Sequence, residues 1–256
     1  MRATFEEYVE RYADIAHIRR EDGICEVRLH TNGGVHKFDG NSHRELAYLF
    51  SDVGQDTDNK IIIFTGTGDR WMDMPDSVDM SSFLPWTPAK YAPLFAETWR
   101  LLWNMLEIEV PVVVAVNGPA AIHAELAVLG DVVLAADTAS FSDAFHFVNG
   151  IVPGDGVQIV WPHVLGPNRA RTFLLFGEEI DAQEALRLGV VKEVVPAERL
   201  NDRAWEIARE LAKQPDVTLR NVRMMFTQEI RRKVVDQLPL GAALEGLGHI
   251  NYWPGQ

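Results

Sequence analysis

Two histidines and an aspartate, His123, His146 and Asp155, lie around turn-forming sequence in the middle of the chain. Between His146 and Asp155 come an Asn-Gly and a Pro-Gly pair, which interrupt regular structure and can fold the chain back on itself. We therefore expect the Asp155 carboxylate to return onto the His146 imidazole. A carboxylate that accepts from one imidazole nitrogen leaves the other free to take a proton. Because no serine or cysteine nucleophile in a recognised context accompanies the pair, the spacing favours a general base that activates water.

Two of the histidines, His123 and His43, are expected where helices begin. His123 follows an apolar run at 110–116 and a turn at 117–119, where a strand should end and a helix start. A helix N-terminus disfavours a protonated imidazole, so we expect a neutral His123 that donates a hydrogen bond to a carbonyl oxygen. His43 is placed in the first turn of a helix capped by Asn41 or Ser42, at the mouth of a cleft.

A long apolar loop, Thr67 to Pro88, follows a buried strand expected at 60–66. An apolar loop of that length inside a compact domain is usually functional, so we expect it to wall a hydrophobic pocket and act as its lid. The alternative is an excursion without a role. The candidate substrate-binding side chains are Phe38, Trp71, Phe83 and Trp86.

The remaining pattern alternates between strands and helices and becomes helical toward the end, which predicts a mixed α/β fold without a sharp linker. Strands are expected at 14–19, 24–30, 60–66, 110–116, 131–136, 140–142 and 190–194. Helices are expected at 5–13, from 41 or 42 to 53, and at 91–106, 168–176, 181–188, 197–213, 215–235 and 240–249.

Composition excludes several classes of partner. The formal net charge is -13, and because nucleic acids and anionic membrane surfaces both require clustered Lys and Arg, we expect neither. The single cysteine, Cys25, cannot form an internal disulfide, which fits a reducing compartment. The N-terminal sequence is charged throughout and the longest apolar run is too short to cross a bilayer. We therefore expect a cytoplasmic protein without a signal peptide.

Five motifs together resemble the crotonase superfamily, also called the enoyl-CoA hydratase/isomerase superfamily, over nearly the whole chain. They are KIIIFTGTG (60–68), EVPVVVAVNGPA (109–120), DVVLAADTASFS (131–142), GIVPGDG (150–156) and GEEIDAQEALRLGVVKEVVP (177–196). The resemblance implies a crotonase-like spiral of ββα units over residues 1–195. It also implies a helical C-terminal region, 196–256, that joins copies of the chain into a trimer or a dimer of trimers.

The departures from that pattern point to one branch of the superfamily. Members acting on acyl-CoA thioesters usually have a glycine pair whose backbone amides form part of an oxyanion hole, where this chain has Ala121-Ile122-His123. Because it has lost the glycine pair and gained histidines, this chain resembles the β-diketone hydrolases of the 6-oxocamphor hydrolase type. The motifs that carry this resemblance are NSHRELAY (41–48), NGPAAIHAEL (117–126), HFVNGIVPGDG (146–156), VWPHVLG (160–166) and LPLGAALEGL (238–247). Matched position by position, they implicate His43, His123, His146, Asp155 and Glu245.

The resemblance implies cleavage of a carbon–carbon bond in a cyclic or bicyclic β-diketone by a retro-Claisen reaction, giving a keto acid without metal or cofactor. His146, held by Asp155, would deprotonate water. His43 and His123 would donate hydrogen bonds to the second carbonyl, and Glu245 would orient His43. Three alternatives stay open: enoyl-CoA hydration or isomerisation of an acyl-CoA thioester, a catalytically silent scaffold, and zinc binding. The histidines lack the short local spacing of common zinc motifs.

Overall fold

The computed structural model describes residues 2–74 and 86–251. Its main sheet has six strands in the order β1-β2-β3-β4-β5-β8, in which β1 and β2 are antiparallel and all later neighbours are parallel. The strands are β1 (Ala16–Glu21), β2 (Ile24–Leu29), β3 (Ile61–Thr65), β4 (Val112–Val116), β5 (Val132–Ala136) and β8 (Glu193–Val195). A small second sheet pairs β6 (Ser140–Phe141) with β7 (Ile180–Asp181).

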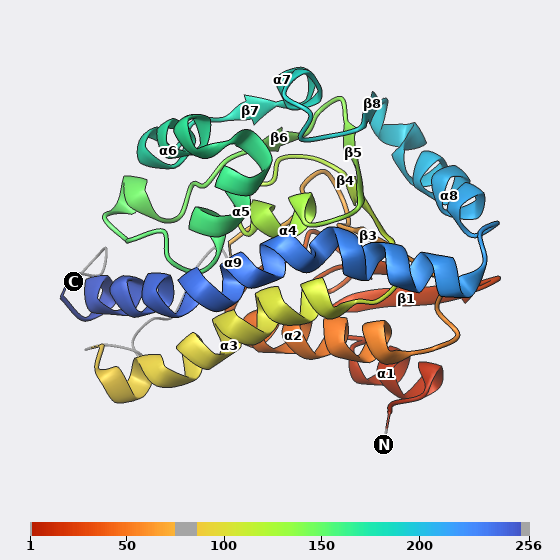
Figure 1. Ribbon diagram of the computed structural model, residues 1–256, viewed down its shortest axis with the longest axis horizontal. Coiled ribbons are helices and arrows are strands. Elements are labelled where there is room, and N and C mark those ends of the chain that lie inside the picture. Colours follow the sequence, from red (N-terminus) through yellow and green to blue (C-terminus); the bar gives the residue numbers. More distant parts are fainter. Residues whose placement is uncertain (1, 75–85, 252–256) are drawn as a thin grey trace.

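Helices surround this sheet (Figure 1). They are α1 (Phe5–Arg11), α2 (Gly40–Gln55), α3 (Pro88–Glu107), α4 (Ala124–Val128), α5 (Val157–Leu165), α6 (Pro167–Phe176), α7 (Ala182–Arg187), α8 (Leu200–Leu211) and α9 (Asp216–Asn251), with short 3-10 turns at Phe147–Asn149 and Ala197–Arg199. In Figure 1, α3 crosses the molecule beside both α2 and α9, and it packs against each of them. The predicted mixed α/β fold is confirmed.

The opening hairpin and the buried strands follow from local sequence. Asp22 and Gly23 connect β1 to β2 with φ angles of 51° and 81°, the left-handed conformation that a tight two-residue hairpin turn requires. Every residue of β3 and β4 is buried, as expected for continuous apolar strands covered on both faces. Among the described helices, none combines the length and apolarity needed to cross a membrane.

Two helices differ from the sequence prediction, and both contain proline. Residues 216–251 form one helix, α9, where a break was expected before residue 240, and Pro239 lies inside it. Helix α5 was not predicted and contains Pro162. Proline removes one backbone donor and normally marks a helix boundary. Here burial of Val234, Leu238 and Ala242 on either side of Pro239 favours continuation.

The C-terminal helices share the core of the sheet. Trp205 and Ala208 of α8 and Ile230 and Val234 of α9 belong to the same buried cluster as the strands, and α8 packs directly on β3, β4 and β5. The division of the chain at residue 195 remains a prediction.

Candidate active site

A cavity of about 440 Å³ opens between the carboxyl ends of the parallel strands, α3 and α9. Loops leaving β2, β3 and β4 all reach it, because parallel neighbours end at the same edge of the sheet. Four of the five predicted catalytic residues line it: His43, His123, Asp155 and Glu245. The complete lining is Phe38, Asp39, Gly40, His43, Met74, Trp86, Leu94, Thr98, Ile122, His123, Phe145, Asn149, Ile151, Asp155, Glu245 and His249.

His146 lies behind Asp155 and contacts two carboxylates. Its Nδ1 lies 2.8 Å from Oδ1 of Asp143 in a hydrogen bond, and its Nε2 lies 3.3 Å from Oδ2 of Asp155. The sequence prediction paired His146 with Asp155 and missed Asp143, although a spacing of three residues before the histidine was a usable signal. His146 does not line the main cavity, so Asp155 is the member of the pair that faces it.

His146 and Asp155 each stabilise the charged form of the other. Burial alone disfavours a charged imidazole, but the Asp155 carboxylate and the hydrogen bond to Asp143 outweigh it and hold the pKa of His146 well above its usual value. Burial alone would raise the pKa of Asp155, yet the His146 charge lowers it below its usual range. At neutral pH the pair is therefore an imidazolium beside a carboxylate.

His123 sits at the start of α4 in a strained conformation. Its φ and ψ are 46° and 40°, a left-handed region that non-glycine residues seldom adopt. Its Nδ1 lies 2.6 Å from Oε1 of Glu125, which is buried. Burial disfavours the charged ring, but the Glu125 carboxylate outweighs it and raises the pKa of His123. This direction is opposite to the one expected from a helix N-terminus, because the carboxylate two residues later outweighs the effect of the short helix.

His43 is held by a different carboxylate from the one predicted. It lies in the first turn of α2, whose cap is Asp39 rather than Asn41 or Ser42. Its Nδ1 lies 3.6 Å from Oε2 of Glu97 on α3, whereas the prediction assigned Glu245 to this role. Burial lowers the pKa of His43, so its imidazole is neutral.

Phe38 packs against both imidazoles that line the cavity wall. Its ring centroid lies 4.2 Å from that of His123 and 5.7 Å from that of His43, and the two imidazoles are 5.8 Å apart. His43 and His123 thus lie beside each other in the cavity wall, and a ring nitrogen of His123 lies within 4.8 Å of a carboxylate oxygen of Asp155.

Glu245 reaches the site because α9 approaches the 150–156 turn closely. A Cβ on Gly154 would lie 2.1 Å from the carbonyl oxygen of Gly241, so only glycine fits at this crossing. As a result, a carboxylate oxygen of Glu245, a carboxylate oxygen of Asp155 and a ring nitrogen of His146 all lie within 4.8 Å of one another. Burial, and then the charge of Asp155, raises the pKa of Glu245 well above its usual value.

The four side chains predicted to form apolar walls of the pocket differ in where they lie. Phe38 and Trp86 line the cavity. Trp71 does not line it; the side chain is fully buried and packs edge-on against Phe64 at 5.0 Å. Phe83 lies outside the described residues. Apolar lining from Leu94 and Ile151 was not predicted, since nothing in the sequence distinguishes these side chains from core residues.

The sequence model of the enoyl-CoA hydratase/isomerase family matches residues 19–245. The chain belongs to this family. A curated relative, the 1,2-epoxyphenylacetyl-CoA isomerase of Escherichia coli strain K12, is 30% identical over 223 residues, which cover 86% of this chain and 84% of the relative. The carnitinyl-CoA dehydratase of Citrobacter koseri is 28% identical over 211 residues, 82% of this chain and 79% of the relative.

Two solved structures share the fold. A β-diketone hydrolase from the cyanobacterium Anabaena sp. PCC 7120, bound to (S)-3-oxocyclohexyl acetic acid, is 44% identical with a TM-score of 0.91, and the match covers 96% of this chain and 97% of that one. An enoyl-CoA hydratase/isomerase from Mycobacterium paratuberculosis is 22% identical with a TM-score of 0.84, covering 93% and 94%. At that identity the second match shows the fold alone.

Two groups of side chains in this family member could approach one metal ion. One consists of His146, Asp155 and Glu245, and the other of His123, Glu125 and Asp155. In both groups a carboxylate already faces an imidazole, at 3.3 Å for Asp155 and 2.6 Å for Glu125. A cation would have to displace the imidazole proton, so its binding would compete with protonation.

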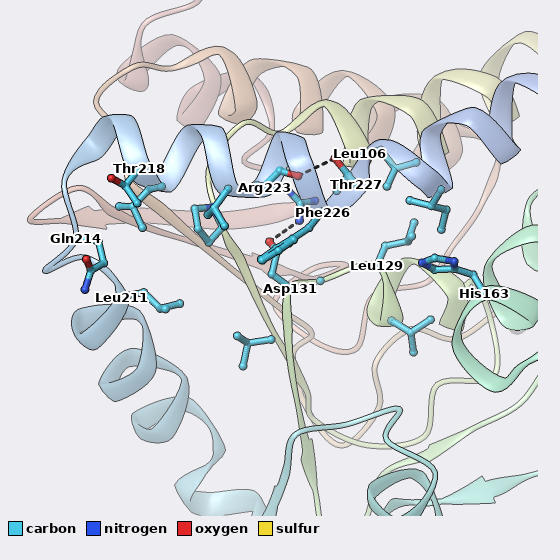
Figure 2. A pocket seen from close by; sticks show the side chains of 17 residues that line it. Leu106, Leu129, Asp131, His163, Leu211, Gln214, Thr218, Arg223, Phe226 and Thr227 are labelled. Carbon is cyan, nitrogen blue, oxygen red and sulfur yellow. Dashed lines mark hydrogen bonds and ion pairs between the residues drawn. The ribbon is translucent and has the colours of Figure 1, made fainter.

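A second hollow, of about 530 Å³, lies between α8, α9 and the β4–β5 connection (Figure 2). Its lining is mostly apolar, and Phe226 covers part of it. Its charged pair is internally satisfied, because buried Arg223 binds Asp131 and donates to two backbone carbonyls. This arrangement stabilises the helix packing and supplies no group for chemistry.

Proposed function

We propose that this protein is a cofactor-independent hydrolase that cleaves the carbon–carbon bond of a bicyclic β-diketone by a retro-Claisen reaction, producing a keto acid. One observation carries the proposal. His123 occupies the left-handed position at the start of α4 and faces the same cavity as His43 and Asp155. Side-chain donors therefore stand where a substrate carbonyl could be held. A relative 44% identical is a β-diketone hydrolase bound to a cyclic keto acid, the class of product expected here.

The attacking water is assigned to the Asp155–His146 pair. Oδ1 of Asp155 is buried and has no hydrogen-bond partner among the described residues, and its side chain lines the cavity where the water would bind. Because Nδ1 of His146 is engaged by Asp143, Nε2 is the nitrogen that can receive the proton. The neutral form of His146 is then the active base, and the pair titrates as a unit.

The negative charge that develops on the second carbonyl oxygen is assigned to His43 and His123. After hydroxide adds to one carbonyl, collapse of the tetrahedral intermediate breaks the carbon–carbon bond and leaves an enolate on the other carbonyl. His123, whose raised pKa favours the protonated ring, and neutral His43 donate to that oxygen. A charged donor in a buried site stabilises a developing oxyanion more strongly than a neutral one.

The lining supports a compact apolar substrate with two acceptors. Phe38, Leu94 and Ile151 offer apolar surface, and His43, His123, Asp155 and Glu245 supply the polar groups. The test is incubation with a panel of bridged bicyclic 1,3-diketones, following loss of the diketone and appearance of a keto acid by mass spectrometry. His146→Ala and Asp155→Asn should abolish turnover, and a wild-type enzyme inactive on the whole panel would overturn the proposal.

A second candidate is hydration or isomerisation of an acyl-CoA thioester, because the named curated relatives are CoA-ester enzymes. It predicts saturable binding of an acyl-CoA and turnover of an enoyl-CoA. The β-diketone hypothesis predicts neither.

We also propose association through the C-terminal region, as a trimer or a dimer of trimers. Helix α9 exposes large apolar side chains, among them Met225, Phe226, Leu240 and Leu247, at 62–65% of their surface. Light scattering would give the mass in solution, and a monomer at micromolar concentration would contradict this assembly.

A further inference from the structure

Two carboxyl groups that face the same cavity differ in charge. Asp155 and Glu245 place oxygens within 4.8 Å of each other, and both side chains are about nine-tenths buried or more. Two buried carboxylates this close disfavour each other's ionisation, so one of them holds a proton more readily than an isolated carboxyl group. The adjacent imidazolium of His146 stabilises the charge of Asp155.

The proton therefore resides on Glu245. Its imidazole neighbour is His249, one helical turn later on α9, with Nε2 of His249 3.7 Å from Oε1 of Glu245. Burial, and then the charge of His146, lowers the pKa of His249 to about 4, so this imidazole is neutral and does not favour ionisation of Glu245. Oε2 of Glu245 has no hydrogen-bond partner among the described residues and belongs to a side chain that lines the cavity.

We propose that Glu245 is the acid that protonates the α-carbon of the enolate, and that His249 positions it. This inference rests on the proposed retro-Claisen function. Glu245 is better placed for this step than His146, because Glu245 lines the main cavity and His146 does not. Glu245 approaches from α9, so its proton reaches one face of the enolate only.

The protons balance over a complete catalytic cycle. In the active form, in which His146 is neutral, water gives one proton to the Asp155–His146 pair as its oxygen bonds to the carbonyl carbon. The carbon–carbon bond then breaks, its electron pair becomes the enolate, and the new acid group keeps the second hydrogen of water. The O–H bond of Glu245 breaks as the new C–H bond forms, leaving a carboxylate. The proton on the Asp155–His146 pair then crosses at most 4.8 Å to Glu245 and restores the starting state.

Packing explains how His249 holds its place. Its ring lies 5.3 Å from that of Trp86 and 5.5 Å from that of Tyr91. Tyr91 in turn donates from its hydroxyl to the carbonyl of Ala242, and a Cβ on Gly246 would lie 2.3 Å from the Tyr91 ring. Residues on one face of α9 therefore fix the imidazole against the turn of helix that carries Glu245.

The experiment is turnover of a bicyclic diketone in D2O, with the configuration of the new C–D bond read by NMR. Wild type should place one deuterium at the carbon α to the ketone in a single configuration. Glu245→Gln, which keeps the shape of the side chain, should lower kcat about 100-fold, the scale of a general acid, and distribute deuterium over both positions. His249→Phe keeps an aromatic ring and should lower kcat and partly mix the label while KM stays unchanged.

The control is Glu229→Gln, on the outer surface of the same helix, which should match wild type in rate and label. A single configuration retained in Glu245→Gln would overturn the inference and leave the proposed function intact. If wild type consumes no diketone, the proposed function fails, and the inference fails with it.

Discussion

Replacing Asp143 with asparagine tests how His146 is tuned. The amide of the Asp143→Asn variant would keep an oxygen that accepts from Nδ1, so the geometry of the 2.8 Å hydrogen bond is preserved while the negative charge is lost. Both side chains are only 5% exposed, so solvent screens this charge weakly. An opposite charge at such a distance typically shifts a pKa by about one to three pH units.

The sign of the expected change follows from the direction of the shift. Asp143 raises the pKa of His146, so Asp143→Asn should lower it and let the neutral base form at lower pH. In wild type, kcat/KM should rise with pH through an apparent pKa above the usual value for histidine, about 6.5. In Asp143→Asn this acid limb should move down by about one to three pH units.

The assay is kcat/KM for diketone loss between pH 5 and 10, with Asp58→Asn as the control because that side chain is 79% exposed. An acid limb that stays at the wild-type pH in Asp143→Asn would refute the assignment of His146 as the base. An acid limb already below pH 6 in wild type would refute the raised pKa.

Three further predictions concern neighbouring groups. His123→Asn keeps a residue that tolerates a φ of 46° but removes the imidazole, so the protein should fold normally and lose about 100- to 1,000-fold in kcat; unchanged kcat would exclude His123 as an oxyanion donor. Glu245→Gln should be more stable than wild type at neutral pH, because the pKa of Glu245 is raised in the folded state. The wild-type protein therefore loses stability as the pH rises above the unfolded-state pKa of about 4.3, and the variant does not. Melting temperatures of the two proteins that run parallel from pH 4 to 8 would contradict this. The small cavity of about 20 Å³ behind His123 and His146 should hold one ordered water, since Oδ2 of Asp143 and Nε1 of Trp161 belong to its lining and lack partners in the described chain; a high-resolution crystal structure without density there would disprove it.

The sequence predicted which residues lie in the site more accurately than it predicted which side chains contact one another. The turn between His146 and Asp155 does return the carboxylate to the imidazole, because glycine and proline at 150–154 permit a tight reversal. The pairing of Glu97 with His43 joins α3 to α2, and no local pattern encodes the packing of two helices far apart in the sequence.

The pKa shifts of the site residues were the hardest feature to predict from the sequence. A helix N-terminus argued for a neutral His123, but α4 spans only Ala124–Val128 and the buried Glu125 carboxylate is much nearer. Similarly, Glu245 appeared as one charged residue among many on a long helix. Its raised pKa depends on burial and on Asp155, which become visible only when α9 is placed against the 150–156 turn.

The most direct test of the central claim is turnover of a bicyclic diketone in water enriched in oxygen-18. If the Asp155–His146 pair activates water against a carbonyl, the keto acid should carry one labelled oxygen, in its carboxylate, in addition to any label that the ketone exchanges without enzyme. Consumption of the diketone without label in the carboxylate, or no consumption at all beside turnover of an enoyl-CoA, would contradict the account.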